Sequence, residues 1–111
     1  MNEEIVKCSM DMILNAGDAR EECFKALKEM AAFNFEAANK KMEEARNAII
    51  KAHQIHTNYL QESIQKESNE YSVLFAHAQD TLMTVNTEIN LSENLLNVFE
   101  ELDRRISKLE A

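Results

Sequence analysis

The chain contains no proline and a single glycine among its 111 residues. Tight turns between β-strands usually depend on Gly, Pro or Asn-Gly pairs, so a sheet protein of this length would need more glycine and proline. Good helix formers, chiefly Ala, Glu, Lys, Leu and Met, are abundant instead. With 45% hydrophobic residues the chain can bury a core. We therefore predict an all-α fold in a single domain, residues 1–111.

Hydrophobic residues recur at intervals of three and four positions, which predicts helices over about residues 2–31, 35–65 and 70–109. Because the two connections are short, neighbouring helices are predicted to run antiparallel, as an up-down-up bundle. The stripes predicted to be buried are Ile5, Met12, Ala16, Ala19, Cys23, Ala26 and Met30 in the first helix; Phe35, Ala38, Met42, Ala45, Ile49, Ala52, His56 and Tyr59 in the second; and Leu74, Ala78, Thr81, Val85, Glu88, Ser92, Leu95, Phe99, Leu102, Ile106 and Leu109 in the third, with Leu82, Ile89 and Leu96 beside them.

The predicted helix boundaries carry polar capping residues. Asn2 and Asn34 are the expected N-caps of the first two helices, and Ser68 or Asn69 that of the third. Gly17, in "NAGDAR", interrupts the first helix, where glycine costs about 1 kcal/mol relative to alanine. We therefore expect a close backbone approach or a break in the helix at Gly17.

The charge of the chain excludes some classes of partner. The net charge is −8, and residues 71–103 contain six acidic residues but no Lys or Arg. Such a surface repels a phosphate backbone, so nucleic-acid binding is not expected. The sequence has no segment like a signal peptide and no apolar run near the roughly 20 residues that span a membrane, which predicts a cytoplasmic protein.

The third predicted helix is the longest and is apolar around much of its circumference. Three helices of this size bury only a modest core, so part of this surface needs a partner. Self-association would cover it, and we predict a homo-oligomer.

The two cysteines, Cys8 and Cys23, fall on the first predicted helix. At about 1.5 Å per residue they would lie roughly 22 Å apart, too far for a disulfide. We expect both to be small buried residues without a redox or metal role.

A polar stripe crosses the third helix in the stretch "HAQDTLMT". Residues three or four apart share a helix face, so His77, Asp80, Thr84 and Thr87 lie together while Gln79 points elsewhere. In one interpretation His77 and Asp80 pair, or the stripe faces water. In the other, His77 is a nucleophile, because a neutral imidazole can attack phosphorus near pH 7.

His53 and His56 raise the alternative of a metal-binding bundle that uses these residues with His77, since histidines three apart can chelate a metal. The Glu-x-x-His pairs of di-iron bundles are absent from the sequence. A P-loop, a Cys-x-x-Cys and a Gly-x-Ser-x-Gly are absent as well, so the sequence carries none of these nucleotide, zinc or hydrolase signatures.

The segment "YSVLFAHAQDTLMT" resembles the region around the phosphorylated histidine of the lactose/cellobiose-type enzyme IIA of the bacterial sugar phosphotransferase system. "NAGDAR" and "KAHQIHT" resemble further segments of that family, and the resemblance covers essentially the whole chain. It implies a trimer of three-helix units packed as a nine-helix bundle. It also implies that His77 accepts a phosphoryl group on its tele nitrogen from the histidine-phosphocarrier protein. His77 would then pass the group to a cysteine of the IIB component during uptake of a lactose-, cellobiose- or chitobiose-type sugar, and contact with the membrane would be only through the transporter complex.

The resemblance further implies that Asp80 lies buried near the threefold axis, where three copies share a divalent metal ion, expected to be magnesium. Three carboxylates on one axis cannot all remain charged and unpaired without a large cost. The chain departs from the family pattern at Thr81, where members commonly have a second histidine, and it lacks the Gly often found before Tyr71. Thr81 supports the alternative of a non-catalytic helical adaptor, a relative that has lost phosphotransfer.

Overall fold

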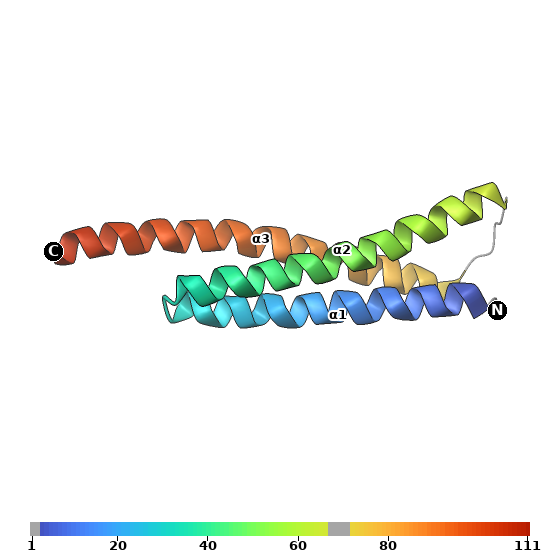
Figure 1. Ribbon diagram of the computed structural model, residues 1–111, viewed down its shortest axis with the longest axis horizontal. Coiled ribbons are helices and arrows are strands. Elements are labelled where there is room, and N and C mark those ends of the chain that lie inside the picture. The colour runs from blue at the N-terminus through green and yellow to red at the C-terminus, as the bar shows by residue number, and fades with distance from the viewer. Residues whose placement is uncertain (1–2, 67–71) are drawn as a thin grey trace.

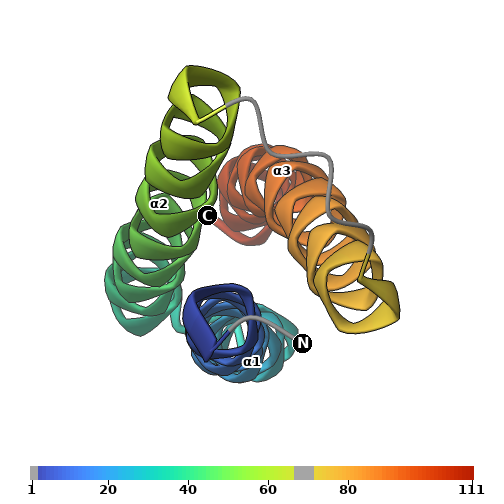
Figure 2. The ribbon, with the colours of Figure 1, turned by 90° about the vertical axis from the view of Figure 1, so that its right-hand side faces the viewer.

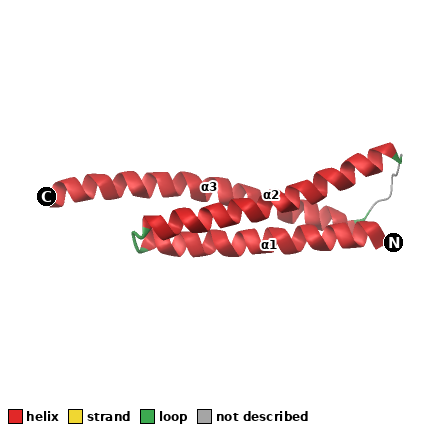
Figure 3. Cartoon of the chain, viewed as in Figure 1, coloured by secondary structure: helices red, strands yellow, loops and turns green. Residues whose placement is uncertain are grey.

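The computed structural model describes residues 3–66 and 72–111. These residues form three helices: α1, Glu3–Ala31; α2, Phe35–Gln65; and α3, Val73–Glu110. None of the described residues lies in a strand (Figure 3), so the predicted all-α fold is confirmed. The chain runs up, down and up along a bundle of 64 × 19 × 18 Å (Figure 1). Viewed along its length, the three helices occupy the corners of a triangle (Figure 2).

The third helix begins later than the sequence predicted, at Val73 rather than at residue 70. Ser72 has an extended backbone and is the N-cap: its Oγ accepts a hydrogen bond from the Phe75 N–H at 3.2 Å. This bond satisfies one of the N–H groups that a helix N-terminus leaves without a partner. Ser68 and Asn69, the residues predicted as caps, lie outside the described residues, as does Asn2.

The turn between α1 and α2 closes with the hydrogen bonds of a Schellman motif. The Asn34 N–H donates to the Glu29 carbonyl at 2.9 Å, and the Phe33 N–H donates to the Met30 carbonyl at 3.0 Å. Phe33 occupies the left-handed position with φ 56°, where glycine is usual, and its ring packs against Phe35 at 5.3 Å between centroids. Asn34 precedes α2 as predicted, but its side chain makes no capping hydrogen bond.

The core lies along the seam of the three helices and follows the predicted stripes of α1 and α2. Every residue predicted for α1 is buried, and so is the middle of the α2 stripe, whereas Phe35, His56 and Tyr59 at its ends are half-buried. Six of the buried residues in α1 and α2 are alanines, which let the two helices lie close together: Ala16, Ala19, Ala26, Ala38, Ala45 and Ala52.

The buried face of α3 differs from the prediction. It consists of Ala78, Leu82, Val85, Ile89, Ser92 and Leu96, and so combines parts of the two predicted rows. The end of the main predicted row, at Leu102, Ile106 and Leu109, is exposed. The reason is that α3 continues past the turn between α1 and α2, where neither helix is present to cover it (Figure 1).

The expectation of a close approach or a helix break at Gly17 is wrong. The helix continues through this residue from Glu3 to Ala31. A Cβ built on Gly17 meets no heavy atom of the described residues within 4 Å, leaving aside its chain neighbours and the adjacent backbone of α1. Gly17 is simply an exposed glycine inside a regular helix.

Gly17→Ala is therefore expected to raise the free energy of unfolding by about 1 kcal/mol, because it restores helix propensity without a clash. Urea denaturation followed by circular dichroism measures the change. Lys51→Ala is the control at an exposed helical position of α2, where alanine and lysine differ little. A destabilised Gly17→Ala protein would contradict the open surroundings of this position.

In the described residues, no helix is both long enough and apolar enough to cross a membrane.

Candidate functional site

The predicted polar stripe lies on the surface of α3. His77, Asp80, Thr84 and Thr87 are all exposed. Within the described residues, the side chains of His77 and Asp80 make no hydrogen bond or ion pair, with each other or with any other group. His77 and Asp80 therefore do not pair. The other form of that interpretation, a stripe that faces water, agrees with the structure, and the imidazole of His77 is accessible from solvent on the single chain.

The residues between His77 and Asp80 face the interior of the bundle. Ala78 is completely buried in the core. Gln79 points away from the polar stripe, as predicted, and toward α2. Its Nε2 lies 3.0 Å from Nε2 of His56. The four residues His-Ala-Gln-Asp thus fix α3 to the bundle through the middle pair and leave the outer pair exposed.

His56 supports this arrangement from α2. Its ring is half-buried and lies against Phe75 at 5.8 Å between centroids. Burial lowers the pKa of His56, and the neighbouring His53 lowers it further. A neutral ring can accept the hydrogen bond that the Gln79 amide donates. The sequence indicated no role of this kind for His56, because the contact depends on how α2 and α3 align.

This lowered pKa predicts a pH effect on stability. In the unfolded chain His56 takes up a proton below about pH 6.5, whereas the folded chain resists protonation until a lower pH. The unfolded state then binds more protons, so the free energy of unfolding should fall as the pH falls below 6.5. Denaturation between pH 7 and pH 5 should show a shallower fall for His56→Gln, which cannot titrate. Equal slopes for the two proteins would contradict this explanation.

Thr81 stands where the family commonly has a second histidine. Its Oγ1 donates a hydrogen bond to the His77 carbonyl at 2.9 Å. Threonine often makes this bond to its own helix, one turn back. The hydroxyl therefore binds the backbone of residue 77.

The alternative of a metal site built from His53, His56 and His77 is not supported. Among residues 3–66 and 72–111, no group of three or more His, Cys, Asp or Glu side chains is arranged to hold a metal ion. His56 bonds to Gln79, and His77 faces solvent.

Cys8 and Cys23 are free and buried, as predicted. Burial raises the pKa of both thiols, that of Cys8 to about 11. The Cys23 sulfur lies 3.2 Å from Oγ of Ser92 and so links α1 to α3. Thiols with a raised pKa are poor nucleophiles, so both residues are structural.

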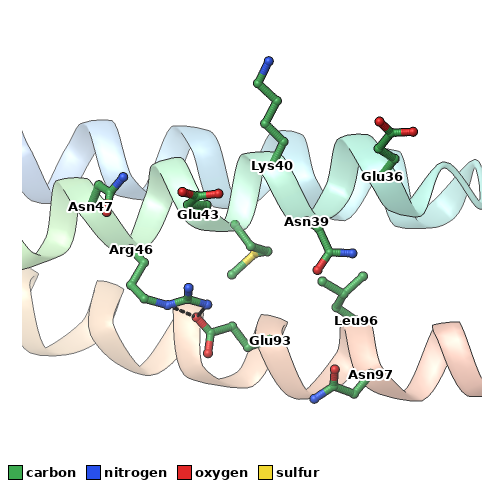
Figure 4. A pocket seen from close by; sticks show the side chains of 10 residues that line it. Glu36, Asn39, Lys40, Glu43, Arg46, Asn47, Glu93, Leu96 and Asn97 are labelled. Atoms are coloured by element: carbon green, nitrogen blue, oxygen red, sulfur yellow. Dashed lines mark hydrogen bonds and ion pairs between the residues drawn. The ribbon is translucent and has the colours of Figure 1, made fainter.

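A groove of about 750 Å³ lies between α2 and α3 (Figure 4). Arg46 of α2 is paired with Glu93 of α3 in this groove, with Nε 2.7 Å from Oε1. The lining is polar and carries both signs of charge: Glu36, Asn39, Lys40, Met42, Glu43, Arg46, Asn47, Glu93, Leu96 and Asn97. None of the residues of the polar stripe contributes to it.

Comparison with known proteins relates this geometry to one family. Residues 7–100 match the family described as "PTS system, Lactose/Cellobiose specific IIA subunit". A lichenan-specific phosphotransferase enzyme IIA component of Bacillus subtilis is 29% identical over 102 residues, which cover 92% of this chain and 93% of the relative. A lactose-specific EIIA component of Staphylococcus aureus is 34% identical over 98 residues, which cover 88% of this chain and 95% of the relative.

Solved structures of IIA proteins superpose on this chain. The crystal structure of PtcA from S. mutans superposes with a TM-score of 0.86 at 34% identity, covering 90% of this chain and 99% of that one. The IIA(Chitobiose)-HPr complex of the Escherichia coli phosphotransferase system, a solution structure, gives a TM-score of 0.80 at 30% identity, covering 92% and 99% of the two chains.

The fold and the family match define a IIA component of a sugar phosphotransferase system. The chain belongs to the lactose/cellobiose-specific IIA family and is a phosphotransferase component of a sugar-transport system.

Proposed function

We propose that His77 is the phosphoryl acceptor of this IIA component. It takes the group from the histidine-phosphocarrier protein HPr and passes it to a cysteine of the IIB component during uptake of a lactose-, cellobiose- or chitobiose-type sugar. The observation that carries the proposal is the position of His77, which is exposed, while His53 and His56 are half-buried on α2. Of the three histidines, all of which are described, His77 is thus the one most accessible to a second protein.

The chemistry requires little from the surrounding residues. The lone pair on the tele nitrogen of neutral His77 attacks phosphorus as the P–N bond to the donor histidine breaks, and the His77 ring keeps its proton on the other nitrogen. Such transfer depends mainly on positioning and on stabilising the charge of the phosphoryl oxygens. His77 lies about one turn from the N-terminus of α3, where the positive end of the helix dipole favours an anion.

HPr as the donor is supported by a relative. The IIA(Chitobiose) protein, which shares this fold, was solved in complex with HPr. An exposed histidine suits direct docking of another protein, since no small substrate has to enter a cavity. The proposal places the chain in the cytoplasm, where it reaches the membrane only through the other transporter components.

We further propose a homotrimer in which the three Asp80 carboxylates converge and share a divalent ion, expected to be magnesium. Asp80 is exposed and has no partner within the described residues, so its carboxylate is available to an ion or a second copy. Carboxylate oxygens are the ligands that magnesium prefers. A single described chain offers no group of three such ligands, so the ion would need all three copies.

The test is transfer from phosphorylated HPr to the purified chain, followed by addition of IIB. We expect acid-labile, base-stable label on the chain, which the IIB component then removes. Absence of label at every HPr concentration would favour the non-catalytic adaptor that Thr81 suggested.

A further inference from the structure

The helices α2 and α3 diverge toward the end of the bundle at which α3 begins (Figure 1 and Figure 2). Close to this end, His56 of α2 contacts two successive turns of α3. Its ring lies against Phe75 at 5.8 Å between centroids, and its Nε2 is 3.0 Å from Nε2 of Gln79. His56 therefore holds the start of α3 against α2 by a ring contact and a hydrogen bond.

A second polar contact between the same two helices lies far from His77. Arg46 Nε is 2.7 Å from Oε1 of Glu93, which at about 1.5 Å per residue is about 24 Å along α3 from His77. Gln79, by contrast, is two residues from His77. A hydrogen bond is directional, so the bond between Gln79 and His56 restrains the rotation of α3 where the phosphoryl acceptor lies.

The side chain of His77 has no hydrogen bond or ion pair of its own within the described residues. The place of its ring is therefore set by the backbone of α3. Phe75 and Gln79 are four residues apart and share the face toward α2, whereas His77, midway between them, is exposed on the other side. A rotation of this part of α3 would carry the imidazole with it.

Phosphoryl transfer between two proteins is sensitive to such a displacement. The reacting atoms must come within about 3–3.5 Å of each other in the correct orientation, and a misplacement of about 1 Å can cost about 100-fold in rate. His56 is half-buried on α2, across α3 from His77. It can therefore affect the alignment of the reacting atoms without touching a partner that docks on His77.

We infer that His56 is a positioning residue for phosphoryl transfer at His77. It acts through Phe75 and Gln79, whose contacts with it fix the start of α3. The inference rests on the proposed function, in which His77 accepts the group from HPr. It predicts an effect on the rate of transfer within the complex and little effect on the affinity for phosphorylated HPr.

Two substitutions separate the contacts of His56. His56→Phe keeps an aromatic ring against Phe75 but removes the hydrogen-bond acceptor, whereas His56→Gln keeps an acceptor for the Gln79 amide. Single-turnover transfer at increasing concentrations of phosphorylated HPr gives the rate at saturation and the concentration at half-saturation. We expect His56→Phe to lower the saturating rate about tenfold and to leave half-saturation within about twofold of the parent value. His56→Gln should stay within about threefold of the parent rate.

His53→Phe is the matched control, because it makes the same change one turn earlier on α2 and should leave the rate unchanged. Phosphoramidate, a small phosphoryl donor, needs no alignment with a docked protein, so it should label His77 equally fast in His56→Phe and in the parent chain. Gln79→Leu should slow transfer from HPr as His56→Phe does. The double variant should be no slower than the slower single variant, because both changes remove the same bond.

An undiminished saturating rate in His56→Phe, on a parent chain that takes label, would overturn the inference and leave the proposed function standing. An equal loss with phosphoramidate or in His53→Phe would also overturn it, because the loss would then not depend on alignment by His56. So would losses that add in the double variant. A parent chain that takes no label from HPr would contradict the proposed function, and the inference with it.

Discussion

His77→Ala is expected to abolish transfer of label from phosphorylated HPr. The imidazole is the nucleophile in the proposed reaction, and alanine offers no lone pair in its place. Because His77 is exposed and makes no side-chain bond within the described residues, its removal should leave the fold unchanged. Label is counted after transfer, and circular dichroism checks that the variant is folded.

His53→Ala is the matched control, since it removes a histidine from α2 and leaves the polar stripe of α3 intact. We expect this variant to take up label to the same extent as the parent chain. Undiminished label on His77→Ala would mean that another residue accepts the phosphoryl group, which would contradict the assignment.

Asp80→Leu is expected to make the oligomer independent of divalent metal. In the parent trimer, removing the ion with a chelator leaves three carboxylates close together, and their repulsion should raise the dissociation constant about tenfold or more. In Asp80→Leu the carboxylates are gone, so the chelator should have no effect. Sedimentation with and without the chelator measures both constants.

Asp18→Leu removes the same charge from an exposed position of α1 and serves as the control. This variant should keep the chelator sensitivity of the parent. A parent oligomer that does not respond to chelator would leave no role for an ion at Asp80.

The sequence predicted the helices well because local signals determine them. The absence of proline and the spacing of apolar residues placed all three, and every residue predicted for the stripe of α1 is buried. The errors arose where the outcome depends on other segments. The local sequence does not show that α3 extends past the ends of α1 and α2. Leu102, Ile106 and Leu109 were therefore assigned to the core, although all three are exposed.

For the candidate site, helical spacing correctly placed His77 and Asp80 on one face. The same spacing could not show how Gln79 is held, because its partner His56 lies 23 residues away on another helix. Such a contact depends on the register between two packed helices, and the spacing of residues within one helix does not determine that register. Gly17 illustrates a related limit: its cost in a helix is predictable, but whether anything packs against it is not.

The most direct test of His77 as the phosphoryl carrier is long-range proton–nitrogen NMR on the phosphorylated chain, which identifies the imidazole nitrogen bonded to phosphorus. We predict that the phosphoryl group is on Nε2 of His77, with the rings of His53 and His56 unmodified. A phosphoryl group found on either of those two rings, or none on His77, would contradict the account.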